Sequence, residues 1–478
     1  MYKSSNIPLV AVPSDLEGCQ QEVPCPENIP LVEPSDLEEC QQEVPCLEDY
    51  VPTSFSSHLG REIWEESKKV LSLAGPVGFN RVSVYAFGVV TQAYAGQFGT
   101  VELAAVSMAT STIGGISFGL MTGMSSAQQT LSGQAFGAKK FNLLGVYLQQ
   151  SFIVMNGTAL IFSLVYFFAA PLLKVLGQSE QVADLTGQFA LWSLPQLFAY
   201  ANYFPPQKFL QSQRKVTLQV AICAGQFLYV VIGPFPETWT GFSVDIFHDV
   251  WSFLKLAASS AVMACVDLWY YRVLALLTGI LKNPAIAVDS FSICLSVYEG
   301  LMMFNSRAAT SVIISTELGA GRPKRTLFSA CVCLGIAMLL GSIFFICIII
   351  ARHDIASIFT SNATVGHTVY ELSIFLAFTL LINSAQPVLS GVAVGAGWQA
   401  YVAKVNIVCY YFIGVPISAL LGFMCNLQVK GIWMGLLVGT SLQILTLAFN
   451  TYRTDWDKEA NAAKNRFKVS GRSRLCSK

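Results

Sequence analysis

Long apolar segments separated by short polar ones run through most of this chain, from about residue 70 to residue 452. An α-helix needs roughly 20 apolar residues to cross the hydrocarbon core of a bilayer, and most of the segments reach that length. The pattern therefore predicts an all-α polytopic membrane protein with eleven spans. We place the spans at residues 70–95, 102–130, 146–172, 185–208, 216–234, 254–281, 286–315, 327–350, 369–395, 402–424 and 429–452.

Two polar tails flank the apolar part. Residues 1–57 contain eleven acidic residues, one lysine and many prolines, and CQQEVPC occurs twice, at 19–25 and 40–46. That composition buries too little apolar surface to form a core, so we expect a disordered tail. It has neither the basic stretch nor the apolar core of a signal peptide. Residues 453–478 are charged, and we expect a soluble C-terminal tail.

The apolar part contains an internal repeat. SGQAFGAKKFNLLG at 132–145 resembles STELGAGRPKRTLFS at 315–329, and the Gly-Ala pairs that begin at Gly137 and Gly319 are 182 residues apart. Tandem helical bundles of related sequence are typical of secondary transporters, whose substrate sites lie near the bilayer midplane at the repeat interface. We therefore expect two pseudo-symmetric lobes, at residues 58–253 and 254–452.

A second landmark of the repeat exposes a gap. The segment PPQKFLQSQ at 205–213 corresponds to QPVLSGVAVGAGWQ at 386–399. Two predicted spans follow the later landmark, but only 216–234 follows the earlier one before the second lobe begins. One span is therefore missing near 215–236, which makes the first lobe incomplete and the total eleven rather than twelve.

Charge gives a second view of this gap. Basic loops mark the cytoplasmic side of a membrane protein, which places the loop with Lys139 and the N-terminal tail there. A single crossing by 216–234 would put the equivalent loop, with Arg322 and Lys324, outside. Either the chain is a shortened product or 216–234 does not cross the bilayer simply.

Composition narrows the function classes. The chain is 53% hydrophobic and only 12% charged, with a formal net charge of zero, whereas soluble domains carry about 25% charged residues. Nothing in this balance favours nucleic acid as a partner. No Ser/His/Asp or Cys/His constellation is evident, and His248, His353 and His367 are isolated. We therefore expect no enzyme, no metal site and no cofactor, and the bilayer as surroundings.

One carboxylate stands near the middle of the span at 254–281. Asp267 has no cation three or four residues away, and Arg272 points to a different face of the helix. An acid at membrane depth costs roughly 2.5–3.5 kcal/mol on insertion scales, so it marks a functional site by default. Asp267 must find a partner on another helix, face water or hold a proton.

A second acid, Glu299, lies near the middle of the span at 286–315. Arg307 follows eight residues later, two helical turns away on nearly the same face. Glu299 is therefore either a second titrating site or a member of a neutralised pair with Arg307, and we favour the pair.

Other polar, aromatic and proline side chains within the spans are candidates for a substrate cavity or for hinges. Amides in spans most often form hydrogen bonds between helices, whereas an aromatic ring can stack on a planar or cationic ligand. Proline at membrane depth is tolerated where a helix lines a cavity or bends. The cavity candidates are Asn80, Gln92, Gln129, Asn202, Tyr271, Asn383 and Gln386, and the hinge candidates are Pro76 and Pro387.

Several segments together resemble the multidrug and toxic compound extrusion (MATE) family, and especially its plant detoxification branch. They include TQAYAGQFGTVELAAVS at 91–107, SGQAFGAKK at 132–140, WSFLKLAASSAVMACVDLWYY at 251–271, ELGAGRPK at 317–324 and QPVLSGVAVGAGWQAYVA at 386–403. The resemblance covers about residues 60–460 in family order. It implies two six-helix lobes that export organic solutes against H⁺ or Na⁺, with Asp267 at the position of the family's coupling carboxylate.

The resemblance also locates departures from the family. Family sequences carry roughly forty more residues between Lys215 and Pro236, the segment 298–307 is shorter, and Gln129 stands where many members have Glu. The expected function is a proton-coupled antiporter that exports secondary metabolites and xenobiotics. We expect a monomer in the vacuolar or plasma membrane, with both tails cytoplasmic if the two-lobe topology is kept. The alternative is a shortened product that does not transport.

Overall fold

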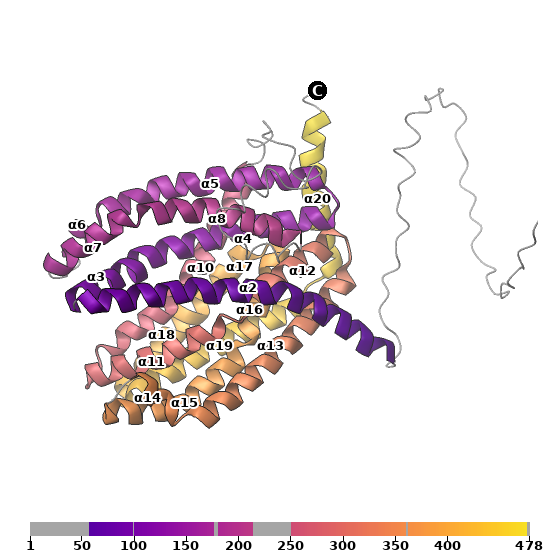
Figure 1. The fold of residues 1–478 in the computed structure, drawn as a ribbon. Coiled ribbons are helices and arrows are strands. Elements are labelled where there is room, and N and C mark those ends of the chain that lie inside the picture. The colour runs from indigo at the N-terminus through magenta and orange to yellow at the C-terminus, as the bar shows by residue number, and fades with distance from the viewer. Residues whose placement is uncertain (1–56, 99, 176–179, 214–249, 360–361, 476–478) are drawn as a thin grey trace, which may run out of the picture. The chain divides into compact units, whose positions relative to one another are not determined.

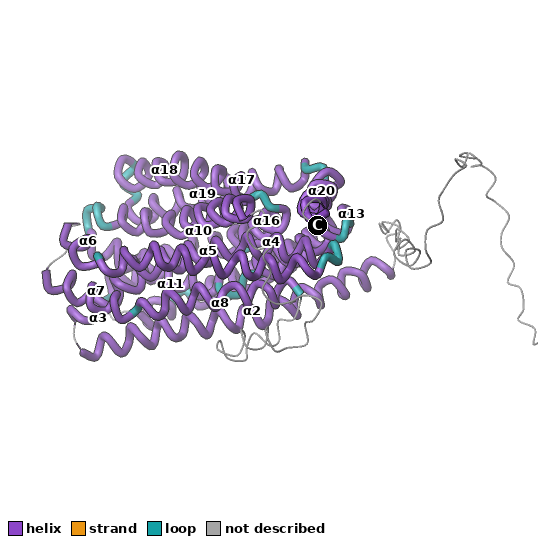
Figure 2. Tube along the Cα trace, turned by 90° about the horizontal axis from the view of Figure 1, so that it is seen from above, coloured by secondary structure: helices purple, strands orange, loops and turns teal. Residues whose placement is uncertain are grey.

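The structure is a computed structural model that describes residues 57–98, 100–175, 180–213, 250–359 and 362–475. The duplicated tail and the predicted span 216–234 lie outside these ranges, so the count of eleven spans stays a prediction. Every regular element in the described ranges is a helix, as Figures 1 and 2 show. The all-α class expected from hydropathy is confirmed.

The first half of the described chain supplies the helices that precede residue 214. They are α2 (Ser57–Phe98), α3 (Thr100–Met108), the π-helix η2 (Ala109–Gly114), α4 (Gly115–Gly137), α5 (Phe141–Phe167), α6 (Ala169–Val175), α7 (Glu180–Trp192) and α8 (Leu194–Ser212).

The second half begins with a long helix and ends with a polar one. Its helices are α10 (Val250–Thr278), α11 (Pro284–Met302), α12 (Arg307–Gly319), α13 (Pro323–Ala351), α14 (Asp354–Phe359), α15 (Ala363–Asn383), α16 (Ala385–Ala396), α17 (Gln399–Asn406), η5 (Ile407–Gly414), α18 (Val415–Ala419), η6 (Leu420–Met424), α19 (Gln428–Arg453) and α20 (Trp456–Leu475).

These helices have the length and composition of membrane spans. Seven helical segments within the described ranges are long and apolar enough to cross a bilayer. Helix α10, with 29 residues, is about 43 Å long at 1.5 Å per residue, which exceeds the roughly 30 Å of a hydrocarbon core. Large apolar side chains such as Leu160, Trp192 and Ile350 are exposed on the outside, where a membrane protein meets lipid.

The span expected at 286–315 is interrupted in the structure. Helix α11 ends at Met302 and α12 begins at Arg307. The Asn305 side chain explains the break, because its Nδ2 donates to the Met302 carbonyl (2.6 Å) and its Oδ1 accepts from the Arg307 backbone N–H (3.3 Å). A side chain that satisfies backbone groups in this way replaces helical hydrogen bonds.

The two landmarks of the sequence repeat occupy matching places. Helix α4 ends at Gly137 and packs against α8, and α12 ends at Gly319 and packs against α16. The two glycine ends also meet. A Cβ on Gly137 would collide with the Thr316 carbonyl, and one on Gly319 would collide with the Gln134 carbonyl. The halves therefore touch, backbone against backbone, through the equivalent ends of equivalent helices.

This contact puts the two basic loops at one end of the bundle. Helix α10 runs antiparallel to α4, since Gly119 lies against Leu268 and Gly123 against Ala261. It follows that α10 begins at the end where α4 finishes, and α8 returns to that same end (Figure 1). From the sequence, a single crossing by 216–234 is expected to put Arg322 and Lys324 on the opposite side of the membrane from Lys139. The structure instead places the two loops at the same end of the bundle.

The close approach of Gly319 to α4 predicts a size limit at this position. Gly319→Ala should lower the free energy of unfolding by about 1–3 kcal/mol, because the added methyl group overpacks a backbone contact. Gly335→Ala in α13 is the matched control, since nothing lies within 4 Å of a Cβ there. It should be neutral or stabilise by up to about 1 kcal/mol. Unfolding of the purified chain in detergent measures both, and equal effects would contradict the contact.

Candidate functional site

Asp267 lies between the two halves of the molecule. It belongs to α10, which packs against α4 from the first half and against α17 from the second. Its side chain is 16% exposed. The position agrees with the general expectation for a repeat interface, where helices of both halves contribute to one site.

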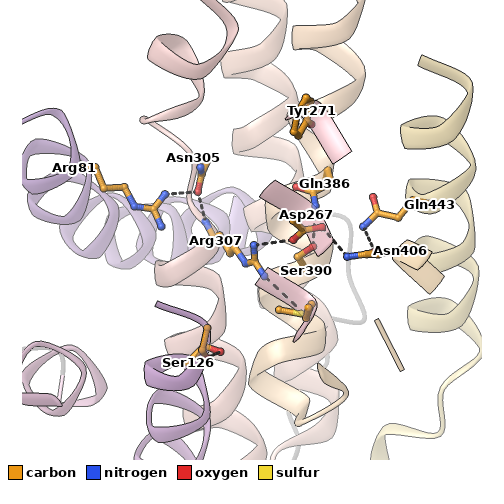
Figure 3. Close-up of polar contacts among 12 residues, drawn as sticks. Arg81, Ser126, Asp267, Tyr271, Asn305, Arg307, Gln386, Ser390, Asn406 and Gln443 are labelled. Carbon is orange, nitrogen blue, oxygen red and sulfur yellow. Dashed lines mark hydrogen bonds and ion pairs between the residues drawn. The ribbon is translucent and has the colours of Figure 1, made fainter. Parts of the chain in front are cut away.

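The Asp267 carboxylate has partners on two other helices (Figure 3). Its Oδ2 lies 3.4 Å from an Arg307 guanidinium nitrogen at the start of α12. Its Oδ1 accepts a hydrogen bond of 2.6 Å from Asn406 Nδ2 in α17. Gln443 Nε2 of α19 in turn donates to Asn406 Oδ1 at 3.0 Å. Of the three options left open by the sequence, the structure selects a partner on another helix.

The pairing of Arg307 corrects the expected pair with Glu299. Glu299 instead lies 3.7 Å from Arg272 of α10 in a half-exposed ion pair. The prediction assumed one continuous helix, in which residues eight apart share a face. The break at Asn305 removes that geometry and turns Arg307 toward Asp267.

The polar network continues from Arg307 toward the first half. Asn305 Oδ1, which accepts from the Arg307 backbone, also accepts from Arg81 at 2.8 Å. Arg81 belongs to α2, so one amide oxygen links helices from both halves. A third cation, Lys208 of α8, is buried and donates to Gln211 Oε1 at 3.2 Å.

Aromatic and amide side chains form a second group next to Asp267. The hydroxyls of Tyr271 and Tyr298 are 2.9 Å apart, and Asn383 Nδ2 donates to Tyr298 at 3.1 Å. Asn383 Oδ1 is buried without a hydrogen-bond partner within the described part of the chain. An unfilled acceptor of this kind is available to a ligand donor.

The remaining amide candidates that the structure describes do not belong to the hydrogen-bond network of Asp267. Gln129 of α4 donates to the Ala308 carbonyl at 2.9 Å, which joins the halves directly. Asn202 pairs with Asn156 between α8 and α5. Gln386 donates to Ser390 within α16 at 3.2 Å. The side chains of Asn80 and Gln92 lie outside the described part of the structure.

The two hinge candidates differ. Pro76 lies inside the continuous helix α2, so no break accompanies it. Pro387 lies in the first turn of α16, directly after the interruption at Ser384 that separates α15 from α16. Proline has no backbone N–H group, but the N–H groups of a first helical turn have no acceptor within the helix, so a proline is tolerated there.

Four members of the network were not anticipated from the sequence: Arg81, Asn305, Asn406 and Gln443. Each is a polar residue inside a predicted apolar span, the same signal that selected the other amides. Across the described ranges, no cluster of three or more His, Cys, Asp or Glu side chains could hold a metal ion. The side chains of this site can form ion pairs and hydrogen bonds, and the Asp267 carboxylate can bind a proton.

An interface of membrane helices from two repeated halves, with charged groups at its centre, is typical of a secondary transporter. The MatE family pattern matches residues 76–234 and 259–420. Protein DETOXIFICATION 29 of Arabidopsis thaliana is 41% identical, with 89% of this chain and 93% of the relative covered. Protein DETOXIFICATION 33 of the same plant is 42% identical, with 86% and 93% covered.

Solved structures agree with this similarity. The eukaryotic MATE transporter AtDTX14 superposes with a TM-score of 0.79 at 28% identity, over 84% of this chain and 99% of that one. The Vibrio cholerae MATE transporter VcmN in the bent form shares the fold, with a TM-score of 0.71 at 15% identity over 84% and 99%. The chain belongs to the MatE family, a family of transporters rather than enzymes.

The alignments with both Arabidopsis relatives also contain positions at which this chain has no residue. The match to DETOXIFICATION 29 runs over 464 positions but covers 89% of the 478 residues, which is about 425, so about 40 positions lack a counterpart. The match to DETOXIFICATION 33, over 452 positions and 86% of the chain, also leaves about 40. The shortfall equals the number of residues expected to be missing between Lys215 and Pro236.

The geometry at Asp267 predicts strong coupling between the two members of its ion pair. A double-mutant cycle of Asp267→Asn and Arg307→Gln should give a coupling energy of about 1–3 kcal/mol, because the pair is largely buried. The cycle of Glu299→Gln and Arg272→Gln is the control. That pair is more exposed, at 37% and 58%, and should give less than about 1 kcal/mol.

Unfolding in mixed detergent micelles supplies the four free energies of each cycle. A coupling energy near zero for Asp267 with Arg307 would show that the ion pair does not form in the folded protein.

Proposed function

We propose that this chain exports organic solutes, namely secondary metabolites and xenobiotics, in exchange for protons, and that Asp267 is the proton-coupling residue. The observation that carries the proposal is the place of Asp267, at the interface of the halves and bonded to two other helices. Glu299 receives no coupling role here, because its partner Arg272 is on the more exposed side of the site.

Protonation of Asp267 changes what the network can hold. The ionised carboxylate accepts from Arg307 and Asn406, which ties α10 to α12 and α17. A neutral carboxyl group attracts the guanidinium far less, so the proton releases these helices to repack. Loss of the proton on the cytoplasmic side restores the ties and the substrate-binding arrangement. Proton binding at Asp267 thus shifts the equilibrium between an arrangement in which α10, α12 and α17 are tied together and one in which they are released.

The substrate contacts that we propose are Tyr271, Asn383 and Gln386. Tyr271 and Asn383 both meet Tyr298 in the second half, and Asn383 Oδ1 remains free to accept a hydrogen bond. Gln129 and Asn202 hold helices together, and we give them no direct contact with substrate. The break before Pro387 is the proposed hinge.

The orientation follows from the shared side of the basic loops. Because α4 and α12 meet at their ends, the loops with Lys139 and Arg322 lie at one end of the bundle, where α2 begins and α19 ends (Figure 1). The positive-inside rule assigns that end to the cytoplasm. We propose a monomer in the vacuolar or plasma membrane, with both tails cytoplasmic and the proton as coupling ion.

Proton coupling at Asp267 predicts a selective loss of transport. Proteoliposomes with an acidic lumen should accumulate fluorescein or the cationic methyl ester of rhodamine only while the pH gradient lasts. Asp267→Asn should reduce this accumulation at least tenfold, because the group that exchanges the proton is gone. Glu299→Gln is the matched control and should retain it. Full accumulation by Asp267→Asn would rule out this residue as the coupling group.

The proposed orientation is tested by thiol labelling of single-cysteine variants. Cysteines introduced as Lys139→Cys and Arg322→Cys should react with a membrane-impermeant maleimide from the cytoplasmic side. The native Cys425, which is exposed beyond η6 at the opposite end, should react only from the other side. Labelling of Lys139→Cys and Arg322→Cys from opposite sides would disprove the arrangement.

A second candidate is a shortened form that does not transport. The shortfall of about 40 positions against full-length relatives favours it. The proteoliposome assay separates the two candidates when Protein DETOXIFICATION 29 serves as the positive control. No accumulation by this chain under conditions where that relative is active would support the non-transporting form.

A further inference from the structure

Three cations and one acid face each other across the interface of the two halves. Arg307 is neutralised by Asp267. Arg81 donates to the neutral amide of Asn305, and Lys208 donates to the neutral amide of Gln211. Within the described ranges, no carboxylate lies within ion-pair distance of Arg81 or Lys208. The site therefore carries an excess of positive charge in the part of the chain that is described.

The three cations are neighbours although they come from α2, α8 and α12. Asn305 Oδ1 accepts from both Arg81 and the Arg307 backbone. Gln128 and Gln129, consecutive on α4, donate to the Pro205 and Ala308 carbonyls at 2.9 Å each. Pro205 lies one turn before Lys208, and Ala308 directly follows Arg307.

Two of the three cations are partly exposed, and the site has unused hydrogen-bonding capacity. The Arg307 side chain is 27% exposed and Arg81 is partly buried, whereas Lys208 is buried. Helix α12 begins at this place, and its N-terminal end attracts negative charge. Ser306, at the N-cap, is 9% exposed, and its Oγ is buried without a hydrogen-bond partner within the described chain.

We infer that the cluster of Arg81, Lys208 and Arg307 is a binding site for the acidic group of the substrate, which makes the substrate an organic anion. This inference rests on the proposed function. Guanidinium groups match carboxylate, sulfate and phosphate oxygens through paired N–H donors. Arg81 supplies the direct contact, and the buried Lys208 acts through its field. An organic cation of the same shape would be repelled by the two cations that lack an acid.

The charge balance explains why the anion does not need to displace Asp267. The ion pair of Asp267 with Arg307 is neutral as a unit, so Arg81 and Lys208 remain available while the pair is intact. Unpaired cations at membrane depth are costly and mark substrate pathways. The anion is the partner that offsets their burial.

Two dyes that share a xanthene ring test the inference. Fluorescein is anionic, whereas the methyl ester of rhodamine is cationic, and fluorescence anisotropy measures their binding to the purified full-length chain in lipid nanodiscs. Fluorescein should bind at least tenfold more tightly than the rhodamine ester. Arg81→Gln should weaken fluorescein binding about tenfold, as expected for a charge-assisted hydrogen bond, and Lys208→Gln should weaken it by a smaller factor.

The controls keep the outcome interpretable. Lys255→Gln removes an exposed cation of α10 outside the cluster and should leave binding unchanged. Arg81→Lys keeps the charge but not the paired N–H donors, so it should retain more binding than Arg81→Gln and less than the native chain. Equal or tighter binding of the rhodamine ester, or unchanged fluorescein binding in both cluster variants, would overturn the inference. Anion-selective binding without transport driven by a pH gradient would instead contradict the proposed function alone. Gradient-driven transport that prefers the cation would contradict only the inference.

Discussion

The fold is organised around one requirement, that a carboxylate at membrane depth must have partners. Asp267 obtains them from α12 and α17, and through Asn406 it reaches Gln443 of α19. In a medium without water to solvate charge, such bonds are difficult to replace. A change in the charge of this single group therefore bears on three helices of the second half and, through α10, on the contact with α4 of the first half.

The interface between the halves divides into a closed end and a polar centre. At the end, Gly137 and Gly319 allow two backbones to touch, and Gln134 and Thr130 add hydrogen bonds to carbonyls of α16. At the centre, the side chains of Arg81, Asn305 and Arg307 are partly accessible. The contact between the halves is therefore closed at the end with the basic loops and polar further along the bundle.

Hydropathy and the repeat predicted most of the helices, and the position of Asp267 predicted a site. The pattern failed where a side chain competed with the backbone. Glu299 and Arg307 share a face only if the helix is continuous, and the Asn305 amide interrupts it. Arg307 thereby changes partner. The contacts of Arg81 and Asn406 were missed for a related reason, since spacing within one span carries no information about which other helix lies opposite.

Taken alone, the sequence determined that the chain is a helical membrane protein with two related halves, because burial in lipid demands long apolar helices and a tandem repeat demands equivalent folds. It also determined that Asp267 must find a partner on another helix, face water or hold a proton, because an isolated charge is unstable at that depth. The tertiary structure decided which partner that is and which cations remain without an acid. These choices depend on distances between helices far apart in the chain, and such distances follow from the packing of the whole bundle.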